Sequence, residues 1–151
     1  MKYIFLFLPV AAILIASCDD NTKQSTNVDK TISNSVTEHC YNYISNKDSV
    51  FMHLKMANDS VTGDLIYNYF EKDKNTGTIQ GKMKGDTLVA DYTFLSEGIE
   101  SIRQVAFLKR GNDFAEGYGD AEEINNKMVF KKTGTLNFKT NIILKHVECN
   151  K

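Results

Sequence analysis

Val61-Thr-Gly-Asp-Leu-Ile-Tyr-Asn-Tyr-Phe70 contains the pattern that decides the fold, because apolar side chains recur there at every second position. Successive side chains of a β-strand point to opposite faces of the sheet, so a period of two indicates a strand with one buried face. The stretches 50–56 and 88–95 repeat this period, and it continues at Val105 and Phe107. The sequence therefore predicts an all-β domain of antiparallel strands.

Turn residues separate these stretches, which predicts a meander of short strands over residues 39–151. Gly63, Gly81 and Gly117 lie inside or beside the strands, where glycine costs stability unless the sheet bends or another backbone comes close. Repeated bends favour closure into a small barrel of about eight strands, with a β-sandwich as the alternative. If the glycines only serve turns, closure is not indicated. The turns are expected at Asn58-Asp59, Asn75-Thr76-Gly77, Gly85-Asp86, Glu97-Gly98, Gly111-Asn112 and Asn125-Asn126.

Residues 1–17 have the order of a secretory signal: Lys2, an apolar run to Leu14, and small residues before Cys18. The run is shorter than the roughly 20 apolar residues of a membrane-spanning helix, and Asp19 follows at once. Ile15-Ala-Ser-Cys18 resembles the bacterial lipobox, in which the cysteine is lipid-modified and becomes the first mature residue. An ordinary secretory signal and a retained helix are the alternatives.

Residues 18–38 are then the lipidated cysteine and a polar tether without aromatic residues, which cannot bury enough apolar surface to fold alone. Twenty residues of flexible coil span roughly 25 Å. Val28, Ile32 and Val36 recur every four residues, so a short helix docked on the domain is the alternative. Removal of Lys2 with the signal leaves 17 of the 18 basic residues against 19 acidic ones, a balance without the positive surface that nucleic acid requires.

Cys40 and Cys149 remain after lipidation, one near each end of the domain. An even pair in an exported protein predicts a disulfide, and in a closed barrel this bond would join the first and last strands. A zinc site formed with His39 and His146 is the competing interpretation, although the usual C-x-x-C hairpin is missing. We expect the disulfide, with no metal and no cofactor.

The segment Ser96–Gln104 packs charged and hydroxyl side chains into a turn and the strand that leaves it. By alternation Arg103 shares a face with Val105. If that face is the interior, the guanidinium needs a partner, with Glu97, Glu116 or Asp91 as candidates. Otherwise Arg103 offers its planar donors to an anion or a partner molecule. The candidate ligand or partner residues are Glu97, Glu100, Arg103, Glu116 and Tyr118.

The sequence has no HExxH, phosphate-binding loop, G-x-G-x-x-G or G-x-S-x-G motif, and His53 lies alone in the middle of a strand. A protein without catalytic residues is therefore expected, with an uncharacterised hydrolase as the minor alternative. Asp48-Ser49, Asp59-Ser60 and Asp86-Thr87 resemble acceptors of envelope O-glycosylation in Bacteroidetes, and each also suits the entry from a turn into a strand.

The lipobox, the Asn- and Lys-rich composition with a single proline, and the run 61–107 resemble a group of small uncharacterised Bacteroidetes lipoproteins. This resemblance implies lipid attachment at Cys18 and a place in the bacterial cell envelope, at the outer membrane. It implies no activity and leaves open which face of the membrane carries the protein.

The function expected from the sequence is non-enzymatic: a monomeric β domain, tethered to the membrane by the lipid on Cys18, that binds an envelope protein or a glycan. A lysozyme-inhibitor-like module is a variant, although its S-G-x-x-Y motif is absent. The alternative is a lipocalin-like carrier of a small apolar ligand. Its cavity would be lined by Met52, Met56, Tyr67, Tyr69, Met83, Tyr92 and Phe94, which equally suit a filled core.

Overall fold

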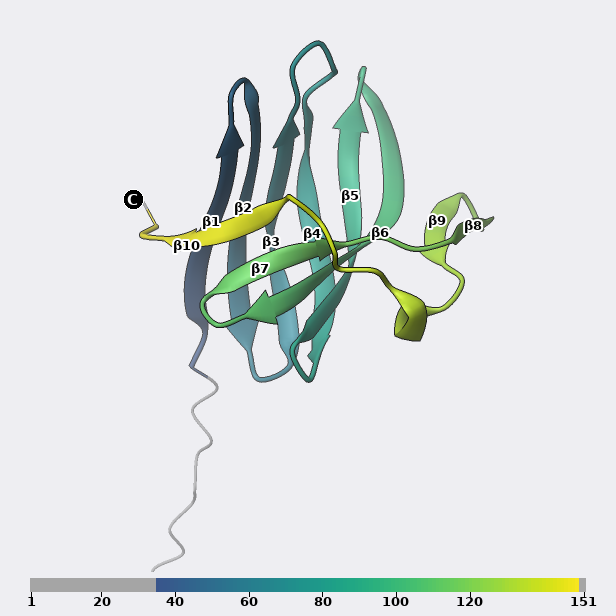
Figure 1. Cartoon of the computed structure of the whole chain (residues 1–151). Coiled ribbons are helices and arrows are strands. Elements are labelled where there is room, and N and C mark those ends of the chain that lie inside the picture. The colour runs from purple at the N-terminus through teal and green to yellow at the C-terminus, as the bar shows by residue number, and fades with distance from the viewer. Residues whose placement is uncertain (1–34, 150–151) are drawn as a thin grey trace, which may run out of the picture. The chain divides into compact units, whose positions relative to one another are not determined.

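The computed structural model describes residues 35–149, which form an antiparallel β-barrel (Figure 1). A single 3-10 turn, Thr133–Thr135, is the only helical element among them. The strands are β1 (Thr37–Ser45), β2 (Asp48–Ala57), β3 (Ser60–Asn68), β4 (Asn75–Lys84), β5 (Thr87–Ser96), β6 (Ile99–Arg110), β7 (Asp113–Gly117), β8 (Ala121–Ile124), β9 (Lys127–Phe130) and β10 (Ile143–Val147).

Eight strands close the barrel in the order β1-β2-β3-β4-β5-β6-β7-β10, because β5 pairs with β6 and β10 pairs with β1. The predicted closed barrel of about eight strands is thereby confirmed. The short hairpin β8–β9 lies outside this ring and joins it through a parallel pairing of β9 with β6. Its turn at Asn125-Asn126 lies where the sequence predicted one, but its strands were not predicted as a unit outside the barrel, because β8 is fully exposed and neither strand alternates clearly.

The core follows the predicted period of two. Strand β2 buries Val50, Met52 and Leu54, and β3 buries Val61, Leu65 and Tyr67 on the same interior. Large side chains from opposite walls fill the centre, as expected for a barrel of eight strands. Those with almost no exposed surface are Tyr67, Tyr92, Phe107, Phe114, Met52, Leu54, Leu65, Leu88, Leu144, Val50 and Val61.

Close approach of neighbouring strands explains two of the strand glycines. A Cβ atom at Gly63 would lie 1.8 Å from the carbonyl oxygen of His53, and one at Gly81 would lie 2.3 Å from that of Val89. Real Cβ atoms do not come this near to backbone, so both positions require glycine. Both residues lie inside strands at a close approach of neighbouring backbone, one of the two reasons expected for strand glycines, and not in turns.

Two boundaries differ from the prediction. Residues 75–77 begin β4 instead of forming a turn, and the chain reverses earlier, through 69–74, where Glu71 has a φ of 56°. Asparagine and glycine suggested a turn there, but the cross-strand partners on β3 and β5 decide the conformation. Strand β1 begins at Thr37, two residues before the expected start of the domain.

The barrel has two ends, named here after residues that line them. The Arg103 end carries the turns β1–β2, β3–β4 and β5–β6. The His39 end carries the turns β2–β3, β4–β5 and β6–β7, and β1 starts there. The proposed signal peptide, Cys18 and nearly all of the tether lie outside the described residues, and within residues 35–149 no helix is long and apolar enough to cross a membrane.

Candidate functional site

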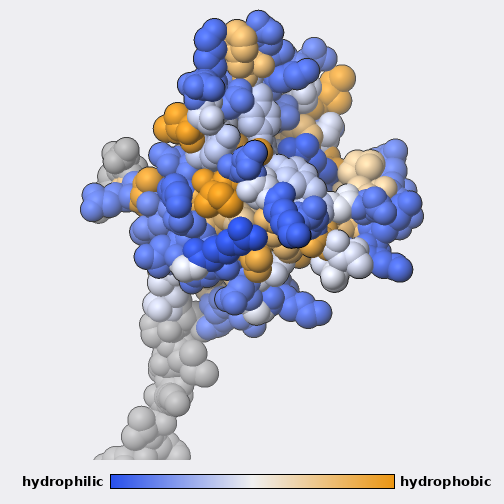
Figure 2. Space-filling view, in the orientation of Figure 1, coloured by the Kyte–Doolittle hydropathy of each residue, from blue (hydrophilic) through white to orange (hydrophobic). Residues whose placement is uncertain are grey.

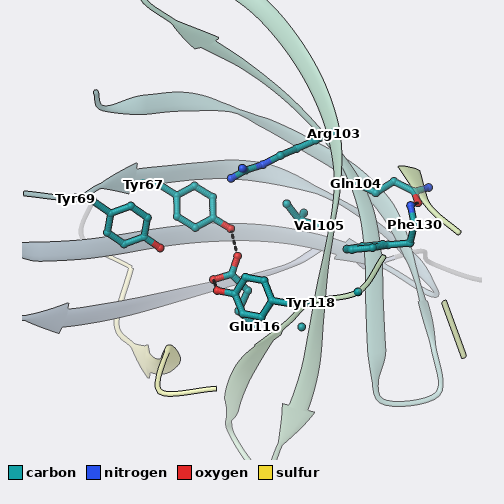
Figure 3. A pocket seen from close by; sticks show the side chains of 10 residues that line it. Tyr67, Tyr69, Arg103, Gln104, Val105, Glu116, Tyr118 and Phe130 are labelled. Atoms are coloured by element: carbon teal, nitrogen blue, oxygen red, sulfur yellow. Dashed lines mark hydrogen bonds between the residues drawn. The ribbon is translucent and has the colours of Figure 1, made fainter. Parts of the chain in front are cut away.

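A cavity of about 260 Å³ opens at the Arg103 end (Figure 3). Its walls come from β3, β6 and β7 and from the chain that follows them, and β9 closes one side. Alternation on β6 and β7 turns Arg103 and Glu116 inward here, near the ends of strands whose deeper residues are apolar. The lining residues are Tyr67, Tyr69, Arg103, Gln104, Val105, Glu116, Gly117, Tyr118, Gly119 and Phe130.

The Arg103 guanidinium lies among aromatic rings. Its central carbon is 5.2 Å from the ring centroid of Tyr67, 5.6 Å from that of Tyr92 and 5.2 Å from that of Phe94. Such contacts attract a cation to the ring faces and hold the planar group in place. Within residues 35–149 no carboxylate lies within 4.0 Å of it, and its buried Nε has no hydrogen-bond partner.

Glu116 is the buried carboxylate of the same cavity, with 6% of its surface exposed. The hydroxyl of Tyr67 donates to its Oε1 at 2.6 Å, and the hydroxyl of Tyr118 donates to its Oε2 at 2.7 Å. These lengths are typical of hydrogen bonds to an ionised oxygen. Figure 3 shows Arg103 and Glu116 reaching toward Tyr67 from different strands.

Burial governs the electrostatics of this group. Desolvation raises the pKa of Glu116, against the opposing effects of the two tyrosine hydrogen bonds and the Arg103 charge. The pKa of Tyr67 and that of Tyr118 are also raised, first by burial and then by the neighbouring carboxylate. Both hydroxyls therefore stay protonated at neutral pH and act as donors to Glu116.

The prediction that an inward-facing Arg103 needs a carboxylate partner is wrong for this structure. Asp91 instead forms an ion pair with Lys127 of β9, and Glu97 lies exposed in the β5–β6 turn. Glu116 shares the cavity, but its oxygens accept hydrogen bonds from tyrosines. The aromatic rings take the place of the missing ion-pair partner, which alternation on β6 alone could not reveal because two other strands, β3 and β5, supply them.

The structure brings three of the five candidate residues together: Arg103, Glu116 and Tyr118. Glu97 and Glu100 are exposed at the β5–β6 turn and do not line the cavity. Phe130 and Gln104 were not predicted to line a site. The amide N–H of Phe130 donates to the Gln104 side chain at 3.0 Å, which joins the hairpin to the cavity wall. No sequence signal pointed to this contact, since it depends on the parallel pairing of β9 with β6.

A second cavity, of about 280 Å³, opens at the His39 end. His39, His146 and Lys109 lie at its rim above an apolar floor that includes Met56 and Phe114. The two imidazole rings are 5.9 Å apart. Burial lowers the pKa of His39, and the neighbouring His146 and Lys109 lower it further. Apart from Tyr41, the titratable side chains that line this cavity are therefore basic.

Cys40 and Cys149 are joined by a disulfide with Cα atoms 5.2 Å apart, across the seam between β1 and β10. Cys149 lies two residues beyond the last strand rather than inside it. The competing zinc interpretation placed His39 and His146 with these cysteines. In the described chain the ligand atoms that cluster with the two sulfurs, all within 4.8 Å, belong instead to His53.

His53 occupies the outer surface beside the disulfide. Its Nε2 lies 3.1 Å from Glu38 and its Nδ1 lies 3.4 Å from Asp64. The side chain is thus held between two carboxylates rather than oriented toward a nucleophile, as expected for an external strand position.

Comparison with known proteins adds no relative: no family model, no curated protein and no solved structure matches this chain.

Proposed function

We propose that this protein is a non-enzymatic binding module of the bacterial cell envelope, which engages a glycan or protein partner through the Arg103 end. One observation carries the proposal. An arginine is fixed by aromatic rings at a cavity, and no described carboxylate lies within ion-pair distance of it. Polar donors that are positioned but unused are a feature of binding sites.

The carboxylates of the cavity support a binding role over glycoside hydrolysis. Glu116 is the only carboxylate among its lining residues, and both of its oxygens accept tyrosine hydrogen bonds. Glycoside hydrolysis generally uses two carboxyl groups on either side of the scissile bond, and Glu97 and Glu100 do not line the cavity. Binding without turnover fits this arrangement better.

A carrier of apolar ligands is favoured less, because the barrel interior is filled. Met52, Tyr67 and Tyr92 have at most 2% of their surface exposed and pack in one core cluster. Met56 and Met83 pack against that cluster at the His39 end. The aromatic and methionine face expected to line one carrier cavity therefore packs mainly as core, and only its ends border the two separate cavities, through Tyr67 and Tyr69 at one end and Met56 and Met83 at the other.

Lipid attachment at Cys18 is part of the same proposal. The lipobox at Cys18 and the resemblance to Bacteroidetes lipoproteins support lipid attachment and an outer-membrane location. Because β1 starts at the His39 end, the tether joins the domain there. The Arg103 end is then the end farther from that junction and open to a partner. Cys18→Ser should abolish incorporation of labelled palmitate and release the chain from the membrane fraction.

Site-specific photo-crosslinking in living cells tests the binding function. A photo-reactive residue at Glu100, exposed at the Arg103 end but outside the cavity lining, should yield a discrete adduct, while the same residue at Lys84, in the β4–β5 hairpin of the His39 end, should not. Arg103→Gln in the Glu100 cross-linking chain should remove the adduct. Equal adducts from both positions, or an adduct that does not depend on Arg103, would refute the proposed binding end.

A further inference from the structure

The cavity at the Arg103 end presents one cation and one carboxylate that do not contact each other. A guanidinium stays protonated in proteins and offers five donors. The Glu116 carboxylate offers about four acceptor sites, of which the tyrosines occupy two. An occupant of the cavity therefore meets unused donors on one side and unused acceptors on the other.

This pairing selects the charge of the occupant. An anion would gain from Arg103 but would bring a second negative charge beside buried Glu116. A cation would gain from Glu116 but would bring a second positive charge beside Arg103. Unpaired or like charges in a desolvated site are costly, so a neutral group is preferred. It has to accept hydrogen bonds and donate them over a short distance, which is the property of neighbouring hydroxyl groups.

Aromatic rings form the remaining walls. Tyr118 keeps 48% of its surface exposed although its hydroxyl is tied to Glu116, so one part of the side chain is fixed and the rest is open. Tyr69 and Phe130 also line the cavity. Tyrosine combines an apolar ring with a polar tip, which suits a ligand that has C–H faces and hydroxyl edges.

Size and surroundings limit the occupant further. The volume of about 260 Å³ is below the range of roughly 300 to 1,000 Å³ that encloses drug-sized ligands, so a single ring fits rather than a long chain. The face of the molecule in Figure 2 is largely hydrophilic, with separate apolar patches instead of one continuous docking surface.

We propose that the cavity binds one neutral sugar ring of a glycan. This inference rests on the proposed binding function and names its ligand. Hydroxyl oxygens of the ring accept from Arg103, a neighbouring hydroxyl donates to Glu116, and a C–H face of the ring packs on Tyr118. The surrounding glycan chain stays outside the cavity.

Saturation-transfer difference NMR on the full chain, extracted in a detergent without a sugar head group, tests the proposal. The probes are methyl glycosides of glucose, galactose, mannose and N-acetylglucosamine, with methyl glucuronide as the anionic probe and methyl glucosaminide as the cationic one. We expect saturation of ring protons for at least one neutral glycoside, and affinity at least tenfold weaker for its charged counterparts.

Substitutions of cavity residues test whether the glycoside binds in the cavity. Arg103→Gln and Tyr118→Ala should each weaken the neutral glycoside at least tenfold. The half-exposed position of Tyr118 makes its truncation compatible with an intact fold, which circular dichroism verifies. Glu116→Gln should also weaken binding. The matched control is Glu97→Gln, which removes the same charge from the exposed β5–β6 turn and should leave affinity within twofold.

The outcomes separate the two proposals. Tighter binding of the glucuronide than of every neutral glycoside would overturn the neutral-sugar inference. So would an Arg103-dependent protein cross-link from Glu100 without any glycoside binding, and this result would leave the binding function standing. If no glycoside binds and no cross-link depends on Arg103, both proposals fail.

Discussion

The two ends of the barrel hold cavities of nearly equal volume, about 260 and 280 Å³, but the charged groups around the two cavities are arranged differently. The Arg103 end places a cation and a buried carboxylate around one space without joining them. The His39 end gathers His39, His146 and Lys109 above an apolar floor, while the carboxylate of Asp113 at this end accepts hydrogen bonds from Lys145 and from the backbone of His146.

Cavity size alone does not identify a binding site in a small barrel. Each end of such a barrel leaves a depression where the strands splay and the core side chains stop. What differs is whether the polar groups have partners. At the Arg103 end the guanidinium has a fixed position and free donors, whereas at the His39 end the basic groups lie closer to solvent and Lys109 is exposed.

Removal of the disulfide should have the largest effect. Cys40→Ser with Cys149→Ser should lower the free energy of unfolding by about 4 kcal/mol, because the bond closes a loop of 109 residues. Urea denaturation followed by circular dichroism measures the loss. Hydrogen exchange should show faster opening of β1 and β10 near the His39 end, while amides around Glu116 keep their protection. A loss below about 1 kcal/mol would contradict the role of the bond as the seam.

Substitution of Arg103 and of Lys109 should lower stability by different amounts at the two ends. Arg103→Met should cost about 2 kcal/mol, because Glu116 is left buried without a compensating charge. Lys109→Met should stay within about 0.5 kcal/mol, as usual for an exposed side chain. Adding Glu116→Gln to Arg103→Met should recover at least half of the loss. Equal costs for the two single variants would show that the charges at the Arg103 end are not coupled.

The barrel could be predicted because the patterns that indicate it, alternation and strand glycines, are local in the sequence. Alternation identifies the faces of β2, β3 and β5, and Gly63 and Gly81 mark close approaches of neighbouring backbone. The site was predicted only in part. Arg103, Glu116 and Tyr118 were chosen for their residue types, but the rings around Arg103 come from Tyr67, Tyr92 and Phe94, which in sequence are indistinguishable from core.

The parts that could not be predicted depend on pairings between distant segments. The parallel pairing of β9 with β6 brings Phe130 to the cavity and Lys127 to Asp91, and it follows from packing after closure rather than from any period in the sequence. The partner of an inward-facing charge is likewise decided by register across several strands. Residue type alone suggested a carboxylate where the structure has aromatic rings.

Acid should affect the two ends in opposite directions. Burial raises the pKa of Glu116 above its ordinary 4.5, so the native protein binds this proton more tightly than the unfolded chain. The contribution of Glu116 to stability therefore falls as pH rises through the interval above 4.5. The pKa of His39 is lowered from 6.5, so its contribution is lost as pH falls below that value.

Stability differences between wild type and two variants measure these opposite slopes. The effect of Glu116→Gln on the unfolding free energy should change with pH above 4.5. The effect of His39→Ala on the unfolding free energy should change with pH below 6.5, with the opposite sign. NMR titration of the Glu116 carboxyl and of the His39 ring assigns each proton directly. Slopes of the same sign would mean that one of the two groups is not buried as described.

The smallest expected effect concerns the His39 end and glycan binding. His39→Ala removes a half-buried ring whose contacts are His146 and a hydrogen bond from or to Thr37, so stability should change by less than about 1 kcal/mol. Affinity for a neutral glycoside should stay within twofold, since a filled core of Leu54, Leu65 and Phe107 separates the two cavities. NMR titration of the glycoside against wild type and variant measures this. A tenfold loss at unchanged stability would place sugar binding at the basic end, because only a direct contact could weaken the ligand while the fold remained intact.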